Sequence, residues 1–111
     1  MGRWNARRRS ESDGRGEAGP LGPSISAVEV TINEGGYLLC TWYQSHEVSV
    51  VWEIWDGVPD EGSLIQTGND YYSVGAHSEG GSTQWEEGHN YYGRVTAFGE
   101  TAVVAGPFNF D

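Results

Sequence analysis

The sequence contains no lysine, a single cysteine and no long run of apolar residues. One cysteine excludes an intrachain disulfide, and with three scattered histidines it cannot complete a zinc site of the usual Cys/His spacing. We therefore expect Cys40 to be a buried free thiol. No apolar stretch follows the basic N-terminus and none is long enough to span a bilayer, so neither Sec-type secretion nor a membrane partner is predicted.

Basic residues are few and unevenly placed. Residues 1–23 hold five of the six arginines against three carboxylates, whereas residues 24–111 keep only Arg94 against thirteen, a net charge of −12. Because nucleic-acid binding requires cations that neutralise phosphates, residues 24–111 are predicted not to bind nucleic acid. The run Arg7-Arg8-Arg9 is short and closely followed by acidic residues, so specific nucleic-acid recognition is not predicted there either.

The composition changes near residue 24. Residues 1–23 are rich in Arg, Gly, Ser and Glu and end with Pro20, Gly22 and Pro23, which predicts an extended N-terminal arm and linker. Residues 24–111 consist of short β-branched and aromatic runs separated by turn residues, without an apolar stripe of helical period. Strands are predicted at 25–32, 37–43, 48–55, 64–68, 71–76, 82–85, 90–98 and 101–110.

About seven short strands in this length predict an all-β fold, an antiparallel two-sheet Ig-like sandwich, with a barrel as the alternative. Trp42, Trp52 and Trp85 are expected to supply much of the core. Alternation along 48–55 directs Trp52 inward and Trp55 outward, and Tyr43 likewise lies opposite Trp42. Gly99-Glu100 is expected to form a two-residue type II′ hairpin turn.

The segment "WEEGHNYYGRVTAF" (85–98) resembles the corner between strands E and F of fibronectin type III domains, and "LLCTW" and "WEIWDG" resemble the B and C strands. The resemblance covers residues 24–111. It implies that Trp85 is the apolar residue of the corner, Gly88 its turn, and Tyr91 the tyrosine whose hydroxyl bonds to upstream backbone. Gly93 replaces a branched residue, so an indole from Trp42, Trp52 or Trp85 is expected to lie over it.

Motifs typical of enzymes are absent from the sequence, including a nucleophile elbow, a phosphate-binding loop and HExxH. His46, His77 and His89 fall in predicted turns, where histidines are usually solvated. Asp56, Asp60 and Glu61 share a loop, but their spacing departs from a calcium-binding ladder. We expect no enzymatic activity, no cofactor and no bound metal.

The arm gives the first functional hypothesis. A basic arm on an acidic domain that begins at its own Met and has no export signal predicts a small complete reading frame. Fibronectin-like and Ig-like domains of this kind are known as accessory proteins of tailed bacteriophages. We therefore expect a virion protein, made in the host cytoplasm and located at the particle surface as capsid decoration or tail protein, in many copies. Its role would be adhesion or particle stabilisation. The residues expected to dock on an acidic groove of the capsid or tail lattice are Arg3, Trp4, Arg7, Arg8 and Arg9.

The alternative is a carbohydrate-binding or adhesion module that recognises host-surface glycans. Exposed aromatic rings can stack on sugars because they offer a large rigid face with a polar edge. The candidates are Tyr43, Trp55 and the pair Tyr71-Tyr72. Coverage of these rings by neighbouring side chains remains an equally open interpretation.

Overall fold

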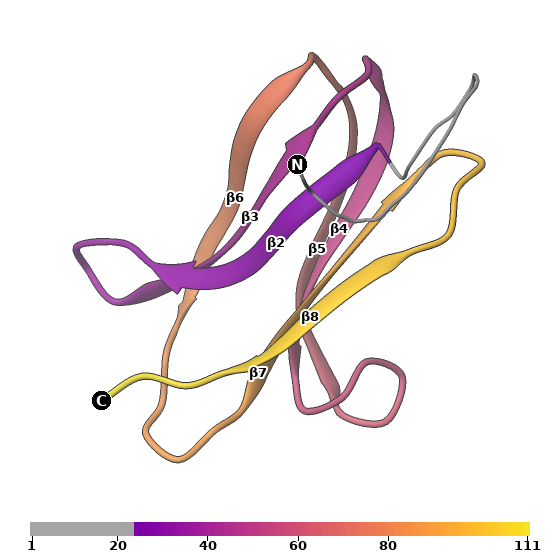
Figure 1. Cartoon of the computed structure of the whole chain (residues 1–111). Helices are drawn as coiled ribbons and strands as arrows, with labels where there is room; N and C mark the ends of the chain where they lie inside the picture. The colour runs from indigo at the N-terminus through magenta and orange to yellow at the C-terminus, as the bar shows by residue number, and fades with distance from the viewer. Residues whose placement is uncertain (1–23) are drawn as a thin grey trace, which may run out of the picture.

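The computed structural model describes residues 24–111, which form a two-layer β-sandwich without any helix (Figure 1). No membrane-crossing helix is found in this part of the chain. The predicted arm, residues 1–23, lies outside the described residues. The strands are β2 (Ile25–Ile32), β3 (Tyr37–Gln44), β4 (Val48–Asp56), β5 (Ser63–Tyr72), β6 (Gly75–Gln84), β7 (Tyr91–Ala97) and β8 (Val103–Phe108).

The strands divide into two antiparallel sheets. One has the order β2-β3-β6 and the other β5-β4-β7-β8. The chain passes between the sheets at β3–β4, β5–β6 and β6–β7, while β2 lies across β7 and β8 of the opposite layer. The prediction of an all-β, Ig-like antiparallel sandwich is confirmed.

The core lies between the sheets and follows the period of two expected for half-buried strands. On β3 the inward side chains include Leu38, Cys40 and Trp42, as the alternation predicts. On β4 they are Val50, Trp52 and Ile54, with Val48 packed at the margin. Trp85 is only partly buried and packs against Phe110 at one end of the sandwich.

Cys40 is fully buried and free, as expected. Burial raises the pKa of its thiol to about 12, because the thiolate would lose hydration that no nearby cation replaces. The thiol is therefore neutral and behaves as a small apolar group of the core.

Two strand predictions are wrong. The expected strands 64–68 and 71–76 do not exist as separate units, because β5 continues through Asn69-Asp70 to Tyr72. The chain then turns at residues 73–74 and enters β6, which covers the predicted strand 82–85 as far as Gln84. Asn69 pairs with Val51 and Asp70 with Val50, and β5 is an edge strand of its sheet. Polar side chains on an edge strand remain solvated, so these two turn-forming residues do not interrupt the strand pairing.

The predicted two-residue hairpin between the last strands is also wrong. β7 ends at Ala97 and β8 begins at Val103, so the connection is longer. Its turn closes with the Glu100 N–H donating to the Ala97 carbonyl at 3.0 Å, which makes Gly99 the third turn residue. The φ of Gly99 is 80°, the value of a type II turn at that position.

Gly93 does not lie under an indole. A Cβ there would meet Val28 at 3.2 Å, Val30 at 3.4 Å and Cys40 at 3.6 Å, so valines of β2 and the thiol of β3 occupy the space. Indoles lie instead over Gly68 on β5, whose Cβ would be 2.5 Å from Nε1 of Trp52, and over Gly36, whose Cβ would be 3.3 Å from Nε1 of Trp85. Close approach of bulky neighbours explains Gly93 as expected, but those neighbours are not the predicted indole.

Candidate functional site

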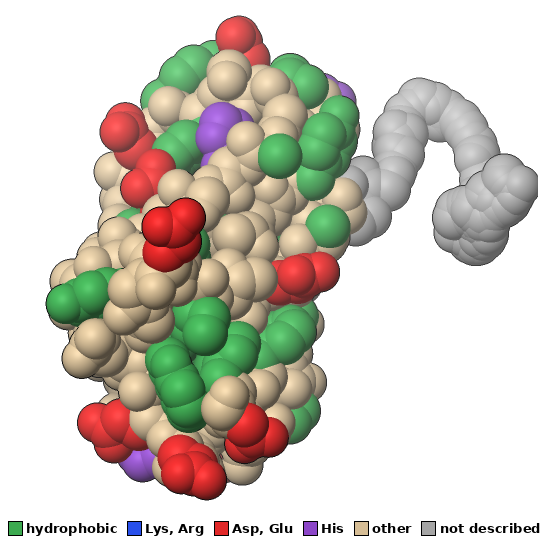
Figure 2. Space-filling model, turned by 90° about the vertical axis from the view of Figure 1, so that its left-hand side faces the viewer, with side chains coloured by type: hydrophobic (Ala, Val, Ile, Leu, Met, Phe, Trp, Pro, Cys, Tyr) green, Lys and Arg blue, Asp and Glu red, His purple; other side chains and the backbone are tan. Residues whose placement is uncertain are grey.

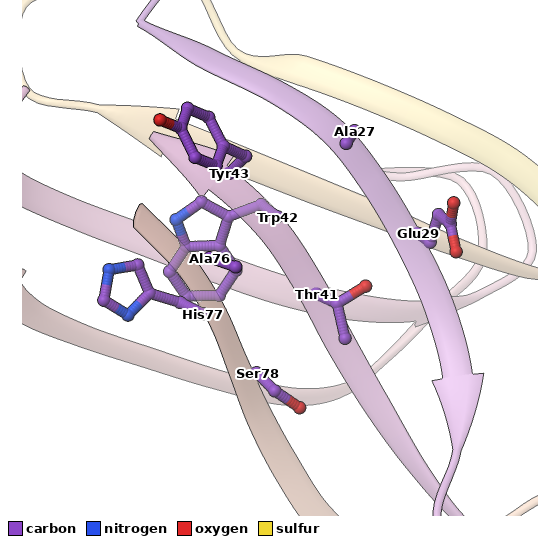
Figure 3. A pocket seen from close by; sticks show the side chains of 8 residues that line it. All are labelled: Ala27, Glu29, Thr41, Trp42, Tyr43, Ala76, His77 and Ser78. Carbon is purple, nitrogen blue, oxygen red and sulfur yellow. The ribbon is translucent and has the colours of Figure 1, made fainter. Parts of the chain in front are cut away.

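A groove of about 430 Å³ crosses the outer face of the three-stranded sheet. Its aromatic wall is Tyr43, which points away from the core as predicted and is 44% exposed. We call this feature the Tyr43 groove. Its lining residues are Ala27 and Glu29 of β2, Thr41, Trp42 and Tyr43 of β3, and Ala76, His77 and Ser78 of β6 (Figure 3).

Strand register arranges the groove in two rows. Tyr43 lies between Ser26 of β2 and Ala76 of β6, both small residues. Small cross-strand neighbours leave the phenol ring uncovered on both sides. This row is the aromatic half of the groove.

The second row is polar. Thr41 lies between Glu29 of β2 and Ser78 of β6 (Figure 3). A carboxylate and two hydroxyls therefore stand side by side across three strands. Within residues 24–111, none of these three side chains takes part in a hydrogen bond.

A β-bulge in β2 makes this arrangement. The register passes from Ser26 opposite Tyr43 to Glu29 opposite Thr41, so β2 has one residue more than β3 over this stretch. Ala27 absorbs the extra residue with a φ of 54°, in the left-handed region that costs a residue with a Cβ some strain. Without the bulge, Ser26 and Glu29 would point to opposite faces of the sheet.

A buried polar network supports the groove from behind. Gln44 is fully buried, and its Oε1 accepts a hydrogen bond from the Trp42 indole at 2.9 Å. Its Nε2 donates to the carbonyls of His46 at 2.8 Å and Tyr72 at 3.0 Å. This glutamine lies one residue beyond the predicted strand 37–43 and is the last residue of β3. Its polar groups are satisfied internally, and the network holds β3 against the end of β5.

Trp55 is not the exposed aromatic residue that alternation predicts. It is on the outer face of the four-stranded sheet but only 9% exposed. The Arg94 guanidinium lies over its ring, 5.5 Å from the centroid, and its indole N–H donates to Glu53 at 2.9 Å. We call Trp55, Glu53, Arg94 and Asp60 the Trp55 cluster.

Arg94 is fully engaged within this cluster. Its Nε donates to Glu53 at 2.6 Å, and its two terminal nitrogens donate to the two carboxylate oxygens of Asp60 at 2.8 and 3.1 Å. These bonds, to Asp60 first and then Glu53, raise the pKa of Arg94, and the guanidinium in turn lowers that of Asp60. Covered by this pairing, Trp55 offers no free ring face for a sugar.

The pair Tyr71-Tyr72 is divided. Tyr71 is 62% exposed, whereas Tyr72 is half-buried and packs edge-on against Trp42 at 5.2 Å between centroids. Burial, followed by a hydrogen bond with Glu79, raises the pKa of Tyr72 to about 12. Tyr72 is therefore a packing residue, and of the two candidates only Tyr71 is exposed.

Only part of the histidine prediction holds. His46 and His89 lie in turns, but His77 is on β6, with its ring 5.5 Å from Trp42 and 4.9 Å from Tyr72. His89 bonds to Asp56 at 2.6 Å, which raises the pKa of the imidazole.

The loop carboxylates do not converge. Asp56 pairs with His89 and Asp60 pairs with Arg94. Among residues 24–111, no group of three or more His, Cys, Asp or Glu side chains is arranged to hold a metal ion.

The hydrogen bond to upstream backbone that was expected of Tyr91 is present. The Tyr91 hydroxyl accepts a hydrogen bond from the Glu86 N–H at 2.8 Å, five residues upstream, and the ring is buried. Burial raises the pKa of this phenol. Gly88 has a φ of 84° in the turn between them. Trp42, Trp52, Trp85 and Gly93 are structural, as described above.

The predicted docking residues Arg3, Trp4, Arg7, Arg8 and Arg9 lie outside the described residues. The first described residue, Ser24, is buried and firmly held. Its N–H and hydroxyl donate to the two Glu100 carboxylate oxygens at 3.0 and 2.7 Å, and its carbonyl accepts from the Ser45 N–H at 2.9 Å. The start of the sandwich is thus fixed to the β7–β8 loop.

No family model, curated protein or solved structure matches this chain.

Proposed function

We propose that the protein is a non-enzymatic accessory protein of a tailed-bacteriophage particle, which attaches through residues 1–23 and displays the acidic sandwich. It would coat the capsid or the tail and serve adhesion or particle stabilisation. The observation that carries this proposal is the division of charge between the two parts of the chain. Five arginines precede residue 24, and a single one follows it among thirteen carboxylates.

The structure strengthens the electrostatic side of the proposal. The single arginine of residues 24–111 has its guanidinium bound to Glu53 and Asp60, so it has little capacity to contact a partner. Figure 2 shows carboxylates spread over one face of the sandwich and no Lys or Arg side chain there. Attachment to an acidic protein lattice therefore depends on the arginines before residue 24, while the displayed domain repels neighbouring acidic surfaces.

The anchored start of β2 also supports the proposal. An arm can fix the orientation of a displayed domain only if their junction is rigid. Ser24 makes four hydrogen bonds to Glu100 and Ser45, which are distant in sequence. A force applied through residues 1–23 would therefore reach the sandwich at Ser24.

The test is incorporation into particles. Deletion of residues 2–23 should leave the sandwich folded, as judged by circular dichroism, and remove the protein from purified particles. Replacing Arg7, Arg8 and Arg9 together with alanine should weaken incorporation strongly, whereas the matched single change Arg15→Ala should have a small effect. Normal incorporation of the deletion variant would contradict the proposal.

A further inference from the structure

We propose that the Tyr43 groove is a binding site for a pyranose ring of a glycan that carries no negative charge. This inference does not depend on attachment through residues 1–23. It rests on the aromatic row, the polar row beside it and the charge of the surrounding surface.

The aromatic row supplies a stacking surface. Tyr43 is 44% exposed, and its neighbours across the strands, Ser26 and Ala76, are too small to cover the ring. The apolar C–H face of a pyranose packs against such a ring, while the phenol oxygen remains available at the edge. Among the other candidates, Trp55 and Tyr72 are covered by neighbours and cannot do this. Tyr71 is 62% exposed but does not line the groove, so it lacks the polar row beside it.

The polar row lies at the right distance. Thr41 is two residues from Tyr43 along β3, a separation of roughly 7 Å for an extended strand. A single pyranose stacked on Tyr43 would therefore place its equatorial hydroxyls over Glu29, Thr41 and Ser78. The groove volume of about 430 Å³ lies in the range of small-ligand sites.

The chemistry of the row matches a polyol. A carboxylate accepts hydrogen bonds from two adjacent hydroxyls, and the hydroxyls of Thr41 and Ser78 can each donate or accept. Since these groups have no hydrogen-bond partner within residues 24–111, a ligand would not have to break protein contacts to reach them. The network of Gln44 and Trp42 keeps the platform rigid, which lowers the entropic cost of binding.

Charge selects among glycans. Glu29 is in the groove, and residues 24–111 carry a net charge of −12. Sialic acids, uronic acids and phosphorylated sugars would place a second anion beside Glu29, which is unfavourable. Neutral hexoses and N-acetylhexosamines are therefore the predicted ligands.

The experiment is a glycan array probed with the full chain, followed by titration of the highest-ranking saccharide and its uronic-acid counterpart into ¹⁵N-labelled protein. We expect shifts of the amides around Tyr43, Thr41 and Ser78 with the neutral sugar, and none with the acidic one. Binding by the acidic sugar with equal affinity would overturn the charge argument.

Matched variants locate the site. Tyr43→Ala should weaken binding roughly 30-fold, the effect of losing a central aromatic contact. Tyr71→Ala, a more exposed tyrosine on the other sheet, should leave the affinity unchanged. Glu29→Gln should weaken binding about tenfold, because it removes a charged acceptor but keeps the shape of the side chain.

Three outcomes would overturn the proposal. The first is that no neutral saccharide on the array or in the titration binds the full chain. The second is that Tyr43→Ala and Tyr71→Ala reduce binding equally. The third is that deletion of residues 2–23 shifts the Tyr43 amide while sugars bind neither form, since the groove would then be occupied by the chain itself.

Discussion

Two outward-pointing aromatic residues, one on each outer face of the sandwich, have opposite environments. On the four-stranded sheet, Trp55 is 9% exposed beneath Arg94, whereas on the three-stranded sheet Tyr43 is 44% exposed between small residues. Strand alternation directs both rings away from the core. The length and charge of the cross-strand neighbours decide whether such a ring is covered or available.

The first prediction tests whether the Tyr43 groove is confined to the outer face of the three-stranded sheet. Cys40 is next to Thr41 on β3 but points into the core, and burial raises the pKa of its thiol to about 12. Its reaction with a thiol reagent at pH 8 should require unfolding, so it should be at least about a thousandfold slower than in denaturant. A matched probe, Ala76→Cys combined with Cys40→Ala, should react rapidly.

The absorbance of the released thiolate from Ellman's reagent measures both rates. Fast reaction of Cys40 in native buffer would mean that the Tyr43 groove extends into the interior. The core side of β3 would then be accessible to solvent like its outer side.

The second prediction compares the two rings directly. Trp55→Ala removes a nearly buried indole and uncovers Arg94, so it should reduce the free energy of unfolding by about 3 kcal/mol. Tyr43→Ala removes an exposed ring and should change it by less than about 0.5 kcal/mol. Urea unfolding followed by far-ultraviolet circular dichroism measures both values, and equal effects would contradict the comparison.

The third prediction concerns charge on the two faces. Arg94→Met keeps an apolar cover over Trp55 but leaves the mostly buried Glu53 carboxylate without its partner, which should cost about 1 kcal/mol of stability. Glu29→Gln on the other face removes a carboxylate that has no cationic partner within residues 24–111 and should leave stability unchanged. The same urea experiment applies, and a loss of stability in Glu29→Gln would show that Glu29 is part of the fold rather than available to a ligand.

Alternation along single strands was sufficient to predict the sandwich, its core positions on β3 and β4, and the outward direction of Tyr43 and Trp55. It could not predict their exposure. Arg94 lies on another strand and Asp60 in a loop, and nothing near Trp55 in the sequence shows that Arg94 covers the indole or that Asp60 binds Arg94. For the same reason the small neighbours that expose Tyr43 become visible only with the register of three strands.

The errors at Gly93 and Gln44 have related causes. The residues that occupy the space at Gly93 belong to β2 and β3 of the opposite sheet, so local sequence cannot identify them. Gln44 lies just outside the predicted strand 37–43, and its own side chain gives no sign of burial. It is buried because the Trp42 indole and two backbone carbonyls, one of them from the end of β5, satisfy its amide.

The smallest expected effect is the acid dependence of the Trp55 cluster. The hydrogen bonds from Arg94 lower the pKa of Asp60 below its ordinary value of 3.8. A carboxyl group whose pKa is lower in the folded state contributes stability above the unfolded value. That contribution is lost as the pH falls below 3.8 and through the folded pKa. It should be small, because the Asp60 side chain is 71% exposed and solvent screens the pair.

Titration of the Asp60 carboxyl carbon by NMR gives the pKa directly, and Arg94→Met should return it toward 3.8. If the variant leaves the pKa of Asp60 unchanged, Arg94 does not hold this loop carboxylate in solution. Arg94 would then be held over Trp55 by Glu53 alone. The exposure of Trp55 and Tyr43 on the two outer faces would differ less than in this structure.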